Sequence, residues 1–248
     1  MSQTKINPEG KTVFISGSNR GIGKAIAIEF LEQRAKKVYA GARDLNSLDN
    51  LKDKYGDKLI PVQLDVTDDN SIDTAASQIK DIDILVNNAG IFETGGIFSD
   101  QVSSSLATNL NVNLWGVVKL TNSVIEQLKQ PKETAIINIS SVVGLANMPM
   151  AATYSVSKAA VHSLTQGMRG ELVNDNVLVM GVYPGPIDTD MARDLPMEKD
   201  SPENVAKNIV QSLIEGKEDV FPDVMSEQVG ALYSSSPKSV EVNFKGYV

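Results

Sequence analysis

The sequence predicts an α/β protein: a doubly wound, mainly parallel seven-stranded sheet with helices on both faces, folded as a single domain. Three observations support this prediction. Short apolar, β-rich runs alternate with longer amphipathic segments, which is the pattern of repeated βα units. The runs are apolar almost throughout, as in parallel strands that are buried on both faces. No linker, internal repeat or low-complexity tract divides the 248 residues.

Each element follows from a local pattern. Strands are expected at the most continuously apolar runs, which are residues 12–16, 38–41, 59–64, 82–86, 135–139, 177–182 and, more weakly, 220–221. Helices are expected at the amphipathic segments, which are residues 22–33, 45–55, 71–79, 103–128, 153–173 and 202–214. A polar, helix-like tail ends the chain. Ligands of such sheets bind beyond the carboxyl ends of the strands, so residues that follow strands are the candidate site.

Composition narrows the class of protein. A hydrophobic share of 42% and a charged share of 22% fit a chain with a packed core. The net charge of −8 argues against nucleic acid and anionic membranes as partners. With no cysteine and one histidine, disulfides, thiolate sites and histidine-rich metal sites are excluded, and no metal is expected. The sequence shows neither a signal-peptide core nor an apolar run long enough to span a bilayer, so we expect a cytoplasmic protein.

A glycine-rich turn joins the first expected strand to the first expected helix. It reads Gly17, Ser18, Asn19, Arg20, Gly21, Ile22 and Gly23. Glycines permit a tight turn and a close approach of the backbone to a pyrophosphate, while the helix N-terminus offers free N–H groups and a partial positive charge. Alone, the turn could also be a plain strand-to-helix connection. Its position between strand and helix favours a dinucleotide site.

The Gly-x-x-x-Gly-x-Gly spacing resembles that of the short-chain dehydrogenase/reductase family. The resemblance runs from about residue 11 to residue 191, with Ser16 where the family usually has threonine. It implies a Rossmann-type fold and an oxidoreductase that transfers a hydride between a nicotinamide cofactor and a carbonyl or alcohol carbon. Alternatives within this fold are an NAD-dependent alcohol dehydrogenase and a non-catalytic NADP-binding regulatory protein.

The end of the second strand favours NADP(H) as the cofactor. A carboxylate there would hold a ribose 2′-hydroxyl and repel a 2′-phosphate, whereas a guanidinium binds the phosphate. Ala42 occupies the place of the family's NAD-selecting carboxylate, and Arg43 follows it. Arg20 could reach the same phosphate from the glycine turn, although most arginines are solvated surface residues. Asp44 leaves NAD open, because a small shift would bring it to the ribose.

Residues after the third and fourth strands continue the resemblance. Asp65 and Val66 resemble the family's adenine-contacting pair, although Asp65 could instead begin the next helix. The turn Asn87-Asn88-Ala89-Gly90 matches a family motif letter for letter. By resemblance Asn87 braces the sheet. Asn88, Ala89 and Gly90 line the cofactor.

The expected catalytic group is built on a tyrosine and a lysine. Tyr154 and Lys158 are four residues apart and share a helix face. A nearby ammonium favours phenolate and so lowers the pKa of the tyrosine, which makes it an acid and base. On its own the pair is most often ordinary helix. The resemblance adds Ser141, 13 residues before Tyr154, and Asn113, 28 residues before Ser141.

The resemblance implies a role for each of these four residues. Tyr154 exchanges a proton with the substrate oxygen, and Ser141 donates a hydrogen bond to that oxygen. Lys158 binds the nicotinamide ribose and lowers the Tyr154 pKa, and Asn113 holds a water. Ser140 is the residue most easily confused with Ser141, and Asn109 and Asn111 compete with Asn113; sequence context selects Ser141 and Asn113. Further cofactor contacts are expected from Pro184, Gly185, Ile187 and Thr189.

The substrate side is less defined. A short substrate lid is expected at about residues 188–202, and candidate pocket residues are Phe92, Leu145, Met148, Met150 and Met191. They favour a hydrophobic ketone or aldehyde, unless they are core filler. The resemblance implies a homo-oligomer, with pairing through the long helix and the Tyr154 helix. Both a dimer and a tetramer stay open, because the tail differs from the one that builds an interface in tetrameric relatives.

Overall fold

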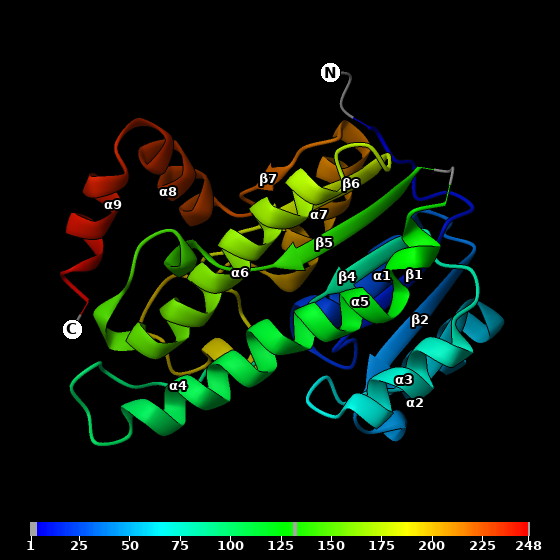
Figure 1. Ribbon diagram of the computed structural model, residues 1–248, viewed down its shortest axis with the longest axis horizontal. Helices are drawn as coiled ribbons and strands as arrows, with labels where there is room; N and C mark the ends of the chain where they lie inside the picture. Colours follow the sequence, from blue (N-terminus) through cyan, green and yellow to red (C-terminus); the bar gives the residue numbers. More distant parts are fainter. Residues whose placement is uncertain (1–3, 131–132, 248) are drawn as a thin grey trace.

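The computed structural model describes residues 4–130 and 133–247. Within them, parallel strands form one seven-stranded sheet in the order β3-β2-β1-β4-β5-β6-β7 (Figure 1). The strands are β1 (Thr12–Ser16), β2 (Lys37–Ala42), β3 (Leu59–Gln63), β4 (Ile84–Asn87), β5 (Thr134–Ile139), β6 (Val177–Val182) and β7 (Asp219–Val220). The order reverses between β1 and β4, which is where a ligand crevice is expected in such sheets. The predicted doubly wound parallel sheet is confirmed.

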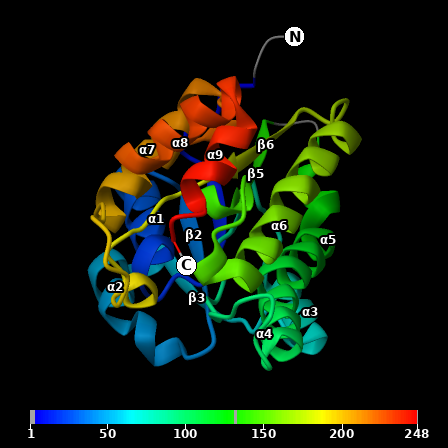
Figure 2. The same ribbon diagram turned by 90° about the vertical axis from the view of Figure 1, so that its left-hand side faces the viewer.

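Helices cover both faces of this sheet (Figure 2). They are α1 (Gly21–Glu32), α2 (Asp49–Tyr55), α3 (Asp69–Gln78), α4 (Val102–Leu110), α5 (Gly116–Leu128), α6 (Ala152–Glu171), α7 (Pro202–Glu215), α8 (Val224–Ser235) and α9 (Pro237–Phe244). Strand side chains alternate between two cores. Val13 and Ile15 pack with α1 and α7, whereas Phe14 packs with α3 and α5.

The long helix predicted at residues 103–128 is divided in the structure. A π-helical segment, Asn111–Trp115, separates α4 from α5. The segment is five residues long, which is too short for hydrophobic periodicity to distinguish it from α-helix, so no sequence pattern indicated it. Such segments occur often at functional sites, and this one carries Asn113.

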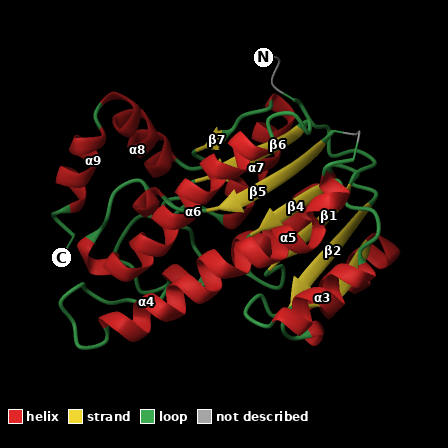
Figure 3. Ribbon diagram, viewed as in Figure 1, coloured by secondary structure: helices red, strands yellow, loops and turns green. Residues whose placement is uncertain are grey.

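The polar tail forms α8 and α9, which lie beyond the carboxyl ends of β5 and β6 (Figure 3). Val229, Val240 and Phe244 of these helices pack with Val142 and Met148 in a third apolar cluster. The backbone N–H of Met150 donates to the Tyr247 carbonyl at 3.0 Å. The tail is therefore part of the wall over the strand ends. None of the described helices is both long and apolar enough to span a membrane.

Candidate active site

A cavity of about 420 Å³ lies at the carboxyl ends of the strands. Most of the residues predicted from the sequence line it: Gly17, Asn19, Arg20, Gly21, Ile22, Gly23, Arg43, Asp65, Val66, Asn88, Ala89, Gly90, Ser141, Tyr154, Lys158, Pro184, Gly185, Ile187 and Thr189. Two of the predicted catalytic and cofactor-binding residues do not line it, Ser18 and Asn113. Within residues 4–130 and 133–247, no group of three or more His, Cys, Asp or Glu side chains could hold a metal ion.

The glycine turn fits an anionic group. Gly17 and Gly21 have φ angles of 69° and 54°, which favour glycine. A Cβ on Gly23 would lie 2.2 Å from the Gly17 carbonyl oxygen, so only hydrogen fits there. The N-cap of α1, Arg20, makes no side-chain cap, and the first turn contains no acidic residue. Backbone N–H groups at this helix end are thus free for a phosphate.

Ser16 and Asn88 hold the turn in place. The Ser16 hydroxyl accepts hydrogen bonds from the backbone N–H groups of Asn88 and Ala89, each at 3.0 Å. The Asn88 amide donates to the carbonyls of Ser16 and Gly17, at 3.0 and 2.9 Å. Ser18 also stabilises this turn, because its buried hydroxyl donates to the Ile15 carbonyl at 2.8 Å. The hydroxyl at position 16 is therefore a structural link between β1 and β4.

The end of β2 presents a cation to the cavity. Arg43 is exposed and Ala42 before it is buried. The Asp44 carboxylate accepts a hydrogen bond from the Asn46 N–H at 3.0 Å, where it caps a short 3-10 turn. Across the crevice, hydrogen bonds from Thr67 and the nearby charge of Arg43 lower the pKa of Asp65. Arg43 is thus the cation at this end, while Asp44 is engaged locally.

The Arg20 side chain is directed to the predicted lid segment, and not to the adenosine end where the sequence suggested it could bind a 2′-phosphate. Its guanidinium donates to the Asp190 carboxylate at 3.2 Å, and Asp190 is also paired with Arg193. This ion pair links the glycine turn to the predicted lid segment 188–202. Both side chains are about half exposed, so the pair is weak and open to exchange with an anionic ligand.

Tyr154 and Lys158 lie together on α6. The Lys158 ammonium is 5.6 Å from the centroid of the Tyr154 ring and donates to the Ile139 carbonyl at 2.8 Å. Phe92 packs edge-on against the tyrosine ring, with centroids 4.9 Å apart. Among the described residues, the Tyr154 hydroxyl has no hydrogen-bond partner in the protein. A phenol with a free hydroxyl therefore faces the cavity beside a buried cation.

Burial shifts the acidity of both groups. It raises the pKa of Tyr154 above its ordinary value of 10.0 and lowers the pKa of Lys158 to about 8. The expectation of a Tyr154 pKa below its ordinary value is therefore wrong. The physical reason is that loss of water from a phenolate outweighs an ammonium that is directed to a backbone carbonyl.

The two neighbouring serines differ as expected. The Ser141 hydroxyl donates to the Pro184 carbonyl at 3.2 Å and accepts a long bond from the Val143 N–H at 3.4 Å. The buried Ser140 hydroxyl donates to the Lys158 carbonyl at 2.9 Å. Ser141 has only weak internal bonds to exchange for a substrate oxygen.

Asn113 is fixed by hydrogen bonds to two neighbouring segments, and its expected role of holding a water stays a prediction. Its amide donates to the Ile91 carbonyl at 3.1 Å and to the Ser157 hydroxyl at 2.9 Å, and its oxygen accepts from the Ile91 N–H at 2.9 Å. Both amide hydrogens are engaged, so only one lone pair of the oxygen is left for the expected water. The side chain mainly joins the loop after β4 to α6, beside Tyr154 and Lys158.

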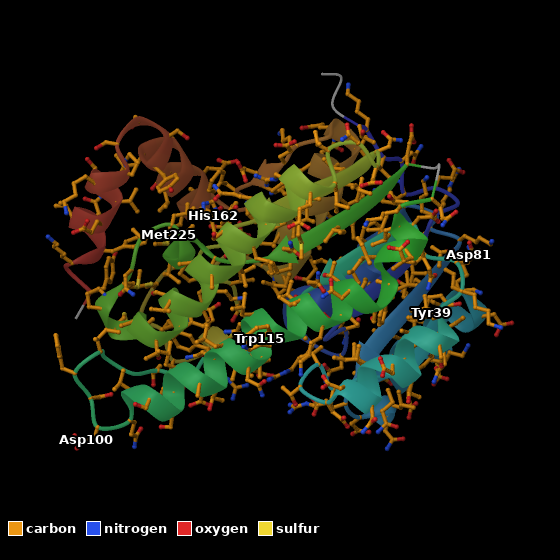
Figure 4. All side chains as sticks on the ribbon, viewed as in Figure 1. Tyr39, Asp81, Asp100, Trp115, His162 and Met225 are labelled. Carbon is orange, nitrogen blue, oxygen red and sulfur yellow. The ribbon has the colours of Figure 1, made fainter. Side chains whose placement is uncertain are left out.

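The apolar end of the cavity is only partly foreseen by the sequence. Phe92, Met148, Met150 and Met191 line it, whereas Leu145 packs in the cluster behind. Lining residues that sequence reasoning missed are Val143, Ala151, Ala192, Leu195, Met197 and Met225. Met225, labelled in Figure 4, belongs to α8 and reaches the cavity only through the fold. No local pattern could have indicated it.

Comparisons with known proteins agree with this geometry. A family model described as short chain dehydrogenase matches residues 11–200. A 3-oxoacyl-(acyl-carrier-protein) reductase from Vibrio cholerae is 34% identical over 198 residues, which covers 78% of this chain and 80% of that protein. The crystal structure of a short chain dehydrogenase from Burkholderia cenocepacia in complex with NADP is 30% identical, with a TM-score of 0.90 over 97% of this chain and 99% of that one. A short-chain dehydrogenase from Sphingobium yanoikuyae in complex with NADPH is 25% identical, with a TM-score of 0.80 over 94% and 95% of the two chains.

Proposed function

The chain belongs to the short chain dehydrogenase family, and from this premise we propose that it is an NADP(H)-dependent oxidoreductase acting on a carbonyl or secondary alcohol carbon. One observation carries the proposal. Tyr154, Lys158 and Ser141 line the same cavity as the glycine turn, so a proton donor and an anion cradle serve one ligand space. An intact set of these groups favours an enzyme over a non-catalytic regulator.

Different residues fit different parts of the cofactor. The free N–H groups at the start of α1 fit a pyrophosphate, and Arg43 fits a 2′-phosphate. Lys158, beneath the cavity, is within reach of ribose hydroxyls at the Tyr154 end. When bound, the cofactor supplies the hydride that the protein itself cannot provide.

The proton is moved by Tyr154. During reduction the phenol donates its proton to the carbonyl oxygen, and Ser141 donates a hydrogen bond to the same oxygen as negative charge develops there. With a pKa of about 8, Lys158 is mainly an ammonium at neutral pH, and its charge favours the phenolate that proton transfer leaves. In oxidation of an alcohol, the phenolate removes the proton in the reverse direction.

A rate comparison tests the catalytic proposal. We expect the wild type to oxidise NADPH with a vicinal diketone, and Tyr154→Phe to be slower by about 10²- to 10⁴-fold, as expected for loss of an acid–base group. Tyr183→Phe is the matched control, because Tyr183 is buried and does not line the cavity. Equal rates for wild type and Tyr154→Phe would exclude this mechanism.

The choice of NADP(H) over NAD(H) has its own support. Arg43 lines the cavity, and Asp44 already serves as a cap. The Burkholderia relative was solved with NADP. Replacing Arg43 by glutamine should weaken NADPH binding by about 10- to 100-fold, the usual range for a lost charge-assisted bond. NADH binding should change by less than about twofold, because NADH has no 2′-phosphate to lose a contact. Equal loss for both cofactors, measured by fluorescence titration, would contradict the assignment.

We further infer that two copies pair through the helices α4, α5 and α6. Trp115 at the π-helical joint is 52% exposed and Val156 on α6 is 37% exposed, both high for apolar side chains in a protein surface. Light scattering on the purified chain, with Trp115→Glu as the comparison, would show a dimer or larger assembly that the variant loses.

A further inference from the structure

Part of the apolar end of the cavity is formed by a segment that follows the residues matched by the family model. The family model ends at residue 200, yet Met225 of α8 lines the cavity. This end is therefore built in part by a segment that the family model does not describe, and substrate selection is the property we expect it to carry.

Asp223 fixes the position of Met225. It is 4% exposed; one carboxylate oxygen accepts from the Gly185 N–H at 2.9 Å and the other from the Ser226 N–H at 2.9 Å. The same carboxylate caps α8, so the helix start is joined to the loop after β6. A Cβ on Gly185 would lie 3.4 Å from the Met225 sulfur, which places the thioether against that loop. Met225 is thus held in place at the cavity wall.

Methionine side chains line much of the apolar end of the cavity. Among the described residues, five methionines line it, Met148, Met150, Met191, Met197 and Met225. Met148, Met150, Met197 and Met225 share the apolar cluster of Tyr154. Methionine sulfur is polarisable and makes favourable contacts with aromatic rings, while its unbranched chain adapts to shape.

Charged groups of the cavity lie elsewhere or are already engaged. Arg43, Asp44 and Asp65 follow β2 and β3, and Arg20 is paired with Asp190. Lys158 is 5% exposed and bonded to a backbone carbonyl. Met148, Met150, Met197 and Met225 pack with apolar and aromatic side chains in one cluster, while the Lys158 ammonium lies on the other side of this end, beside the Tyr154 ring. A carboxylate or phosphate on the substrate would lose its water there without gaining a partner.

We propose that the substrate is an uncharged aromatic ketone, or the corresponding secondary alcohol, whose ring packs against Met225 and the neighbouring methionines. This inference rests on the proposed oxidoreductase function. In reduction, the carbonyl carbon gains a hydride with its two electrons from the reduced nicotinamide. The oxygen gains the Tyr154 proton, so that C=O becomes CH–OH, and the phenolate regains a proton from water.

A set of matched α-dicarbonyl compounds, two diketones and one keto acid, tests the substrate class. The probes are a phenyl methyl vicinal diketone, its cyclohexyl analogue of similar size, and phenylglyoxylate, which adds a carboxylate. With NADPH, kcat/KM for the phenyl diketone should exceed that for phenylglyoxylate by about 100-fold and that for the cyclohexyl analogue by about threefold or more. Preference for phenylglyoxylate or the cyclohexyl analogue would overturn the proposal.

Two adjacent substitutions test the role of Met225. Met225→Glu should lower kcat/KM for the phenyl diketone by about 10-fold or more, mainly through KM, with NADPH binding unchanged. Val224→Glu adds the same charge to the neighbouring residue, which is 68% exposed, and should leave kcat/KM unchanged. Equal loss in both variants would overturn the assignment of Met225.

A milder variant avoids the risk of misfolding. Met225→Leu keeps volume and removes sulfur, so KM for the phenyl diketone should rise about threefold while KM for the cyclohexyl analogue stays constant. An equal rise for both probes would contradict a sulfur–ring contact. If turnover depends on Tyr154 but shows no aromatic preference, this inference fails and the proposed function stands. If turnover does not depend on Tyr154, the proposed function itself fails.

Discussion

Tyr154 and Tyr183 provide a comparison between the two halves of α6: Tyr154 and Lys158 belong to its first half, and Tyr183 is bonded to His162 in its second half. Burial raises the pKa of both phenols above 10.0. The Tyr183 hydroxyl is bonded to the His162 ring nitrogen at 2.7 Å and to the Asp219 carboxylate at 3.3 Å. The Tyr154 hydroxyl lines a cavity and has no protein partner among the described residues. A raised pKa alone therefore does not identify a catalytic tyrosine; a free hydroxyl facing a ligand space does.

The groups around each tyrosine differ in the same way. Along the second half of α6, Arg169 donates to Asp219 at 2.8 Å, and Tyr183 stacks on Phe221 with centroids 5.4 Å apart. This network joins α6, β6 and β7, and its polar atoms are bonded to one another. In the first half of α6, Lys158 has its charge next to the open cavity. One arrangement specifies packing, and the other leaves hydrogen-bonding capacity for a ligand.

The largest expected effect comes from the charge of Lys158 in the first half of α6. Lys158→Met should reduce kcat by about 10²- to 10⁴-fold, because Tyr154 loses the cation that favours its phenolate. His162→Asn removes the ring one helical turn further along α6 and should keep kcat within about threefold, since the His162 ring is bonded to Tyr183 and Gln166 and does not line the cavity. NADPH oxidation at saturating diketone measures both. Comparable losses in the two variants would remove the distinction between the two halves.

Ser141 and Ser140 offer a second, adjacent pair. Ser141→Ala should lower kcat by about 10²- to 10³-fold through loss of a hydrogen bond to the developing oxyanion. Ser140→Ala removes a bond to the Lys158 carbonyl, so it should cost about 1 kcal/mol of stability and leave kcat within about tenfold. Thermal unfolding and steady-state rates together separate the two. A larger rate loss for Ser140→Ala would mean that the two serines were assigned the wrong way round.

The sequence predicted the parts of this comparison that depend on local pattern. Gly17, Gly21 and Gly23 follow an apolar strand at a fixed spacing, and the backbone angles that they need are local. Tyr154 and Lys158 share a helix face because of helical periodicity alone. Strand ends meet at one edge of a parallel sheet, so these residues could be placed near one another before the structure was known.

Features that depend on distant contacts were not predictable. Asp223 accepts a hydrogen bond from Gly185, which is 38 residues earlier in the chain, and Met225 lines the cavity nearby. Sequence periodicity gives no information about contacts between such distant residues. The π-helical joint at Asn111–Trp115 is five residues long, which is too short for hydrophobic periodicity to distinguish it from α-helix. The sequence also could not show that burial outweighs Lys158 at the Tyr154 hydroxyl, since that balance depends on what surrounds both groups.

A smaller effect tests the burial of Lys158. Burial lowers its pKa in the folded protein to about 8, from an ordinary value of 10.5 that the unfolded chain retains. Between these values the unfolded state binds more protons, so the free energy of unfolding should rise with pH, by about 1.4 kcal/mol per unit at most. Urea unfolding at pH 8 and pH 10 should therefore show wild type gaining about 2 kcal/mol relative to Lys158→Met. A flat difference would place the ammonium in contact with water.

The smallest expected change concerns Tyr183, which is bonded to the second half of α6. Tyr183→Phe keeps the ring on Phe221 and removes only the hydroxyl that joins His162 to Asp219. Because this leaves two polar groups with one partner fewer, unfolding should become easier by about 1–2 kcal/mol. Arg169 still holds Asp219, so the network should survive and kcat should match wild type. Denaturant melts and diketone rates measure these two quantities. A rate that fell while stability held would show that proton chemistry extends along α6 to Tyr183, and the separation between the two halves would no longer hold.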